Sequence, residues 1–230
     1  MSTVDSKPRP DRLKALSLEE QRELLNRAKA AKLKRNAVQE TRSIEKASRA
    51  DVLPVSLAQQ RLWFLTQLDS DIEALHVSGA VRMKGGLDTP ALEKALQAIV
   101  ARHESLRTHF LQVQGVPCQI IDEDLAGFAM QRVEIGQAID VDATLNAFIC
   151  KQMAIPFDLE HGPLVRACLV RVDVEDHVLL VIMHHIIADG WSVSLLLSEL
   201  SALYSAYRQG EADPLPELAI QYADYAQWQR

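Results

Sequence analysis

The sequence predicts an α+β fold in which one mixed, mostly antiparallel sheet is covered by helices. Three observations lead to this prediction. Residues 75–83 alternate between apolar and other side chains, as a strand with one buried face does. Residues 89–102 and 191–208 instead repeat their apolar residues at helical spacing. Strands and helices do not alternate regularly along the chain, so a parallel sheet built from βαβ units is not expected.

Residues 1–50 are predicted to form a tail that precedes the folded domain at 51–230. Residues 1–11 are polar and contain two prolines, a composition typical of disorder. Ser17 and Glu20 form a capping-box pattern at the start of an amphipathic helix. That helix ends in a basic patch made of Lys32, Lys34 and Arg35. It is either a solvated linker helix or a docking element for an upstream protein, and the charge run favours the linker.

The first half of the domain contains two helices and three strands. Ser56 is expected to cap a helix that runs through Leu68 and buries one stripe, made of Leu57, Arg61, Phe64 and Leu68, with Leu62 and Leu65 beside it. Gly85 and Gly86 end the strand at 75–83. Asp88 then caps the helix to Arg102, whose buried face is Leu92, Leu96, Ile99 and Val100. Strands at 107–113 and 116–121 are joined by a tight hairpin at Gln114-Gly115.

The second half of the domain supplies the remaining elements. A helix at 140–154 is stopped by Pro156. Strands follow at 164–172 and 177–183, and the second is too apolar to have a solvated face, so it is central in its sheet. The helix at 191–208 is expected to turn four residues inward, Leu196, Leu200, Leu203 and Tyr207, and to end at Gly210. A proline-containing loop leads to a last short helix at 220–230.

Composition narrows the functional classes. The formal net charge of -6 over 230 residues argues against a general nucleic-acid binder, which would carry a basic surface. Three widely spaced cysteines (Cys118, Cys150 and Cys168) indicate reduced thiols in a cytosolic protein. The apolar run 178–183 is too short to span a bilayer, and no signal peptide follows Met1. We therefore expect a cytoplasmic protein without nucleic-acid or membrane partners.

The strongest candidate for chemistry is the segment His184-His185-Ile186-Ile187-Ala188-Asp189-Gly190, which directly follows the apolar run. Neighbouring strand residues point to opposite faces, so His184 and His185 cannot both bind one metal, and no metal site is expected. One histidine could act as a base in a cleft while the other is structural. Asp189 could cap the next helix or pair with an arginine, and Gly190 would permit the turn and a close backbone approach. A buried histidine pair that merely ends a core strand is an equally good reading of these residues.

Four segments together resemble the motifs of condensation domains of nonribosomal peptide synthetases. The central segment matches the family's HHxxxDG signature through His184, His185, Asp189 and Gly190. The opening, second and fourth motifs resemble residues 56–65 (SLAQQRLWFL), 102–108 (RHESLRT) and 222–228 (YADYAQW). They occur in the family's order and cover the chain from Val52 to its end. The opening motif is similar to that of the subtype that joins an L-configured donor to an L-configured acceptor.

This resemblance implies a chloramphenicol-acetyltransferase-like fold, with two lobes in a V and the active site between them. Donor and acceptor would arrive on the phosphopantetheine arms of two peptidyl carrier proteins, so no cofactor would be bound directly. His185 would be the catalytic residue that deprotonates or orients the acceptor amine. His184, Asp189 and Gly190 would support the site structurally, and Arg107 is the expected ionic partner of Asp189.

The chain also departs from the family pattern. Residues 75–78 differ from the usual tyrosine-asparagine pair, which leaves the donor side undefined. The family's second lobe does not follow Arg230, so half of the cleft is expected to be missing and the chain alone inactive or very weak as a catalyst. The uncovered apolar surface would then favour self-association. Four aromatic residues are interpreted as core packing, namely Trp63, Tyr222, Tyr225 and Trp228.

Three functions from different classes fit these residues. The first is amide formation by a condensation enzyme, of which this chain is the N-terminal lobe. The second is a related CoA- or carrier-dependent O-acyltransferase, which would be distinguished by offering alcohols against amines. The third is a non-catalytic interaction module whose residues 1–50 dock an upstream protein of the synthetase. An epimerisation domain is a further relative with the two histidines, and the opening motif argues against it.

Overall fold

The computed structural model describes residues 44–230, apart from 69–72, 124–128 and 137–138. Residues 44–230 form one compact unit, and residues 1–43 belong to a separate one. The predicted helix after Ser17 and its proposed docking role therefore lie outside the described residues. No helix among the described residues is long and apolar enough to cross a membrane.

A four-stranded sheet forms the centre of the unit. Its strands are β2 (His76–Lys84), β5 (Met130–Glu134), β6 (Val165–Asp173) and β7 (Asp176–His184), in the order β2-β7-β6-β5. β7 pairs antiparallel with both β2 and β6, whereas β5 pairs parallel with β6. Residues 177–184 of β7 are all buried, which confirms that this strand is central. In β2, by contrast, half-buried and exposed residues alternate, as its sequence pattern predicts.

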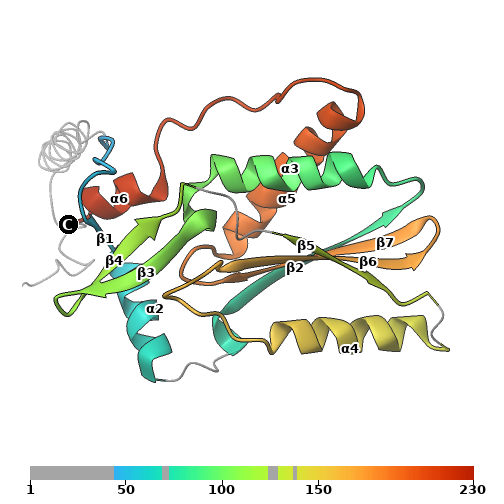
Figure 1. Ribbon diagram of the computed structural model, residues 1–230, viewed down its shortest axis with the longest axis horizontal. Helices are drawn as coiled ribbons and strands as arrows, with labels where there is room; N and C mark the ends of the chain where they lie inside the picture. Colours follow the sequence, from blue (N-terminus) through green and yellow to red (C-terminus); the bar gives the residue numbers. More distant parts are fainter. Residues whose placement is uncertain (1–43, 69–72, 124–128, 137–138) are drawn as a thin grey trace, which may run out of the picture. The chain divides into compact units, whose positions relative to one another are not determined.

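Helices cover both faces of this sheet (Figure 1). α3 (Thr89–Arg102) and α5 (Gly190–Arg208) pack against each other on one face, and α4 (Val141–Met153) lies on the other. The predicted inward residues of α3, and Leu196, Leu200 and Leu203 of α5, are buried in the main core. On the α4 side, Leu145 packs against Val170, Val172 and Val178 of the sheet. Burial of these apolar faces is the main contribution to stability, at about 25 cal/mol per Å² of apolar surface.

A second sheet was not expected, and the prediction of a single sheet was wrong in this respect. β3 (Thr108–Val113) and β4 (Val116–Ile121) form the predicted hairpin, with Gln114 and Gly115 at φ of 52° and 83°. β4 also pairs with β1 (Leu53–Pro54), which gives the order β1-β4-β3. Because β1 has two residues, it carries no period-two pattern that the sequence could show.

The helix after Ser56 is confirmed, but its predicted buried stripe is wrong. α2 (Leu57–Leu68) begins with Ser56, whose Oγ accepts a hydrogen bond from the Gln59 N–H at 3.1 Å. Leu57, Phe64 and Leu68 are 55%, 57% and 70% exposed. The buried residue of α2 is instead Gln59, a polar side chain whose hydrogen bonds are made inside the protein. The spacing of apolar residues does not indicate a buried face that is formed by a polar side chain.

The C-terminal segment packs against the start of the domain. α6 (Tyr222–Trp228) places Asp224 in the interior, where its Oδ1 accepts hydrogen bonds from the Ala47 N–H at 2.9 Å and from Arg49 at 2.7 Å. Two short 3-10 helices, Glu73–Leu75 and Glu104–Arg107, complete the elements. Tyr222 and Trp228 are 38% and 47% exposed, so the core-packing interpretation is wrong for these two aromatic residues.

Candidate active site

β7 ends at His184, and the backbone N–H groups of His184 and His185 bond carbonyls of two different neighbouring segments. The His184 N–H donates to the Leu164 carbonyl at 3.0 Å, and the His185 N–H donates to the Leu75 carbonyl at 2.7 Å. The two side chains have opposite environments, as alternation along a strand predicts. His184 is 2% exposed, whereas His185 is exposed to solvent.

His184 is held as a neutral imidazole. Its Nδ1 accepts a hydrogen bond from the Ile186 N–H at 3.1 Å, so the ring proton lies on Nε2. Burial, together with the smaller effect of charge on His76 and His185, lowers the pKa of His184 to about 4. The rings of His76 and Phe157 face the His184 ring edge-on, with distances of 6.1 and 6.2 Å between ring centroids. These surroundings fit a structural role for His184.

His185 lines an open cavity of about 370 Å³. Its polar lining includes Gln59, His103, Ser105, Ser192, Gln221 and Tyr222. These residues come from α2, from the turn after α3, from the start of α5 and from the start of α6. All four motif segments of the sequence therefore contribute side chains to one cavity.

Hydrogen bonds join the motif segments to one another. Ser56 Oγ lies 3.0 Å from the Tyr222 hydroxyl, which links the first and fourth segments. Gln221 Nε2 donates to the Arg102 carbonyl at 2.9 Å, and its Oε1 accepts from the Glu104 N–H at 3.1 Å. The amide of Gln221 thus fixes the backbone of the second segment at the cavity wall.

Asp189 is the N-cap of α5. Its Oδ1 accepts hydrogen bonds from the Ser192 N–H at 2.8 Å and from the Ser192 Oγ–H at 2.7 Å. These two bonds hold the pKa of the Asp189 carboxyl below its usual value. Such a cap satisfies one of the free N–H groups at a helix start.

The expected ion pair between Asp189 and Arg107 is not formed. Arg107 instead donates to the Asp122 carbonyl and lies 3.9 Å from Glu104. The reason is the pairing of β3 with β4, in which the Asp122 N–H bonds the Arg107 carbonyl and brings the two residues together. Arg107 supports the second sheet and not the start of α5.

Gly190 is also placed differently from the expectation. Its φ lies outside the left-handed region, where Gly85, Gly115, Gly162 and Gly210 are found. A Cβ added at Gly190 would meet no atom of the described residues within 4 Å. Among the described residues, therefore, neither a positive φ nor a close backbone approach requires glycine here.

A partly buried cluster of polar side chains, formed by Arg102, His103 and Glu199, reaches the same cavity through His103. His103 Nε2 is 2.5 Å from Glu199 Oε2, and Arg102 Nε donates to Glu199 Oε1 at 3.2 Å. Sequence reasoning assigned no role to His103, Glu199 or Gln59. His103 and Gln59 could have been flagged because they lie inside motif segments. Glu199 lies outside them and is the single acid of α5, which carries no signal by itself.

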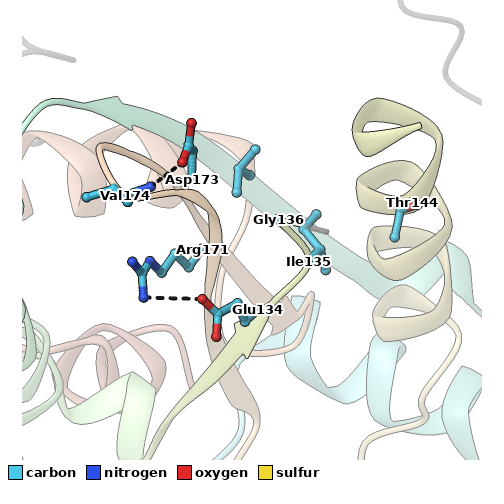
Figure 2. Close-up of a pocket in the computed structure, with 8 residues that line it drawn as sticks. Glu134, Ile135, Gly136, Thr144, Arg171, Asp173 and Val174 are labelled. Atoms are coloured by element: carbon cyan, nitrogen blue, oxygen red, sulfur yellow. Dashed lines mark hydrogen bonds and ion pairs between the residues drawn. The ribbon is translucent and has the colours of Figure 1, made fainter. Parts of the chain in front are cut away.

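A larger cavity, of about 640 Å³, lies elsewhere (Figure 2). It is lined by the ends of β5 and β6 and by Thr144 of α4. Figure 2 shows the two interactions between its lining residues: Arg171 pairs with Glu134 at 3.2 Å, and Asp173 accepts a hydrogen bond from the Val174 N–H at 2.7 Å. Among the residues that the structure describes, no histidine or cysteine lines it, and it lies toward the end of the sheet opposite to His184, so His185 marks the better candidate. Among the described residues, no group of three His, Cys, Asp or Glu side chains could hold a metal ion.

Comparison with known proteins decides the family. Residues 49–230 match the family model described as "Condensation domain". The chain belongs to the condensation domain family. It is 44% identical over 215 residues to one of the proteins that make up the linear gramicidin synthase of Brevibacillus parabrevis, and 43% identical over 188 residues to malpibaldin synthetase of Mortierella alpina. These matches cover 93% and 81% of this chain but only 4% and 3% of the two relatives.

Solved condensation-type domains have the same fold. The X-domain from teicoplanin biosynthesis matches with a TM-score of 0.72 and 34% identity, over 81% of this chain and 39% of that one. The starter condensation domain of rhizomide synthetase matches with a TM-score of 0.71 over 77% of this chain and 43% of that one, and at 21% identity it shows the fold alone. The α+β condensation-domain fold and the family resemblance are therefore confirmed. The condensation domain of these synthetases is associated with peptide-bond formation in nonribosomal synthesis.

Proposed function

We propose that this condensation domain joins a carrier-bound acyl or aminoacyl thioester to the amine of a carrier-bound aminoacyl group, and that His185 is its catalytic residue. The observation that supports this best is the exposure of His185 in the cavity where all four motif segments meet. His184 is unsuitable as a base, because it is buried and its Nδ1 already accepts a backbone hydrogen bond. His185 is the histidine of the pair that a substrate can reach.

The proposed chemistry follows from the nature of the two groups. The amine nitrogen attacks the thioester carbonyl, a C–N bond forms, and the C–S bond breaks to release the carrier's thiol. The imidazole of His185 accepts a proton from the amine as the bond forms and can return it to the leaving sulfur. An α-amine has a pKa of about 8 and an imidazole one of about 6.5, so the transfer becomes favourable once attack has made the nitrogen acidic. General-base assistance of this kind typically contributes about 10²–10⁴ in rate.

The substrates in this proposal are carried on the phosphopantetheine arms of a donor and an acceptor carrier protein. The cavity at His185 is open, and this chain spans 39% of the X-domain chain that it matches. We propose that a second lobe supplies the opposite wall of the cleft. Residues 1–50 would dock an upstream protein of the synthetase.

The test is a condensation assay with the complete enzyme that contains this domain and with both carriers loaded. His185→Ala is expected to lower the rate of product formation on the acceptor carrier by about 100-fold or more. The matched control is His161→Ala, because His161 is 79% exposed and pairs with Asp158 outside the cavity. A His185→Ala enzyme that condenses at the rate of the His161→Ala enzyme would refute the proposal.

A protein-binding role is the second candidate. It is favoured by the X-domain from teicoplanin biosynthesis, which is 33% identical and was solved in a complex with OxyB. In that case, a partner would still bind after His185→Ala, and deletion of residues 1–43, which leaves Ala47 and Arg49 bonded to Asp224, would abolish binding. Loss of condensation in His185→Ala with unchanged partner binding would show that the domain has both roles.

A further inference from the structure

Two buried amide side chains lie next to the histidine turn. Gln59 of α2 and Gln119 of β4 are 2% and 3% exposed, and Gln59 Nε2 donates to Gln119 Oε1 at 3.1 Å. Gln59 Nε2 also donates to the Ile186 carbonyl at 3.4 Å, and Gln59 Oε1 accepts from the Ser56 N–H at 2.9 Å. Both polar atoms of the Gln59 amide therefore have partners, as a buried amide requires.

The residue after His185 is held at both of its polar backbone groups by side chains. The N–H of Ile186 bonds His184 Nδ1, and its carbonyl accepts from Gln59. On the other side, the His185 N–H bonds the Leu75 carbonyl. Three hydrogen bonds thus bracket the Cα of His185 and fix the direction in which its side chain leaves the backbone. Of the three partners, Gln59 is the one that itself lines the His185 cavity.

We propose that Gln59 is a positioning residue for His185, and that it acts through the Ile186 carbonyl. The inference rests on the proposed catalytic role of His185. Reacting groups must be placed within a fraction of an ångström, and a misplacement of about 1 Å can cost about 100-fold in rate. Without the Gln59 donor, the Ile186 carbonyl loses its side-chain partner, and the peptide between Ile186 and Ile187 is held only by the bond from the Ile187 N–H to the His184 carbonyl at 3.1 Å. The imidazole of His185 is then positioned less firmly in the cavity.

The experiment compares Gln59→Glu with Gln119→Glu in the complete enzyme with loaded carriers. Each substitution puts an isosteric carboxyl into the same buried amide pair. Gln59→Glu keeps the acceptor for the Ser56 N–H but removes the two N–H donors of the amide. Gln59→Met, which has no donor in any protonation state, is measured beside it to exclude an O–H bond from a protonated carboxyl to the Ile186 carbonyl. Gln119→Glu keeps the acceptor for Gln59 and removes instead the donor to the Pro54 carbonyl. The two variants thus differ in whether the Ile186 bond survives.

Gln59→Glu is expected to lower kcat by about 10-fold or more with little change in KM, because the loss concerns the transition state. Gln119→Glu is expected to keep kcat within about threefold of the parent enzyme at a similar melting temperature. The imidazole NMR signals of His185 should shift in the first variant and not in the second. Equal kcat values in the two variants, or unshifted His185 signals in Gln59→Glu, would overturn the inference.

If either carboxyl variant fails to fold, Gln59→Met and Gln119→Met repeat the comparison without a buried acid. His185→Ala is measured in parallel to separate the two proposals. Full activity in His185→Ala would refute the proposed function itself. Loss of activity in His185→Ala together with equal rates for the position-59 and position-119 variants would refute only the positioning role of Gln59.

Discussion

The Nδ1 atom of His184 accepts a hydrogen bond from the backbone N–H of Ile186, two residues later in the chain, at 3.1 Å. An acceptor nitrogen must be unprotonated, so this bond exists only while the imidazole is neutral. Burial keeps it neutral by lowering the pKa of His184 to about 4. The turn that carries His185 is therefore coupled to the protonation state of its neighbour.

The first prediction is that stability falls as the pH is lowered from about 6.5 to about 4. In this range the unfolded state binds a proton at His184 that the folded state does not bind, so acid favours unfolding. Over the whole range the loss at this one group is about 3 kcal/mol. Urea unfolding at several pH values measures it. His184→Asn, whose Oδ1 can accept from the Ile186 N–H without titrating, should flatten the slope, and an unchanged slope in this variant would contradict the assignment.

The second prediction concerns the cap of α5. Asp189→Ala should lower the free energy of unfolding by about 1 kcal/mol, because it removes the acceptor for the Ser192 N–H. A double-mutant cycle between Asp189→Ala and Arg107→Ala should show a coupling energy within about 0.5 kcal/mol of zero. The cycle between Asp189→Ala and Ser192→Ala should show clear coupling, since these side chains bond at 2.7 Å. Strong coupling to Arg107 would mean that the two residues interact after all.

The third prediction compares the stability contributions of two ion pairs, one with a buried carboxylate and one with a partly exposed carboxylate. The Asp224 carboxylate is 1% exposed and accepts hydrogen bonds from Arg49 and from the N–H groups of Ala47 and Gln221. Asp224→Ala removes this acceptor from all three donors and should lower the free energy of unfolding by about 3 kcal/mol. The pair between Arg82 and Asp176 has an equally short N···O distance of 2.7 Å, but its carboxylate is 20% and its arginine 43% exposed, against 1% and 33% for Asp224 and Arg49. Arg82→Ala should leave the unfolding midpoint nearly unchanged. Equal shifts in the two variants, measured by chemical denaturation, would argue against this ranking.

The fourth prediction concerns thiol reactivity. Cys150 is exposed, whereas Cys118 and Cys168 are buried, and burial raises the pKa of the Cys168 thiol. A thiol reagent should modify one cysteine rapidly in the folded protein and all three after denaturation. Cys150→Ser should remove the rapid phase. Rapid labelling of a second thiol in that variant would show that a buried cysteine is accessible.

The fifth prediction is that the 230-residue chain on its own gives no measurable peptide bond between two loaded carriers. Among the described residues the cavity at His185 is open, and in our proposal a second lobe supplies the wall that excludes water and aligns the two substrates; alignment is a large part of the rate. The complete enzyme, assayed with the same carriers, is the control. Robust turnover by the chain alone would refute the proposal that a second lobe completes the site.

Some elements were predicted correctly from the sequence and others were not. The Gln114-Gly115 hairpin, the Asp88 cap and the buried β7 were predicted correctly, because each depends on turn chemistry, capping or apolar character within a few residues. The strand β5 was missed. It has five residues, and half-buried and exposed residues do not alternate regularly along it. The partner of Asp189 was wrong because a charge pair depends on which elements pack together. The spacing within a motif does not contain that information.

The sequence by itself determined the position of the two histidines at the end of a buried strand, the start of α5 directly after them and the family through four motif segments. These features depend on contacts between residues that are close along the chain. Only the tertiary structure decided which histidine is buried and which lines the cavity, and only it brought Gln59, 127 residues before Ile186, within hydrogen-bonding reach of the turn. Period-two geometry separates the faces of a strand, but the packing of distant elements determines which face is covered.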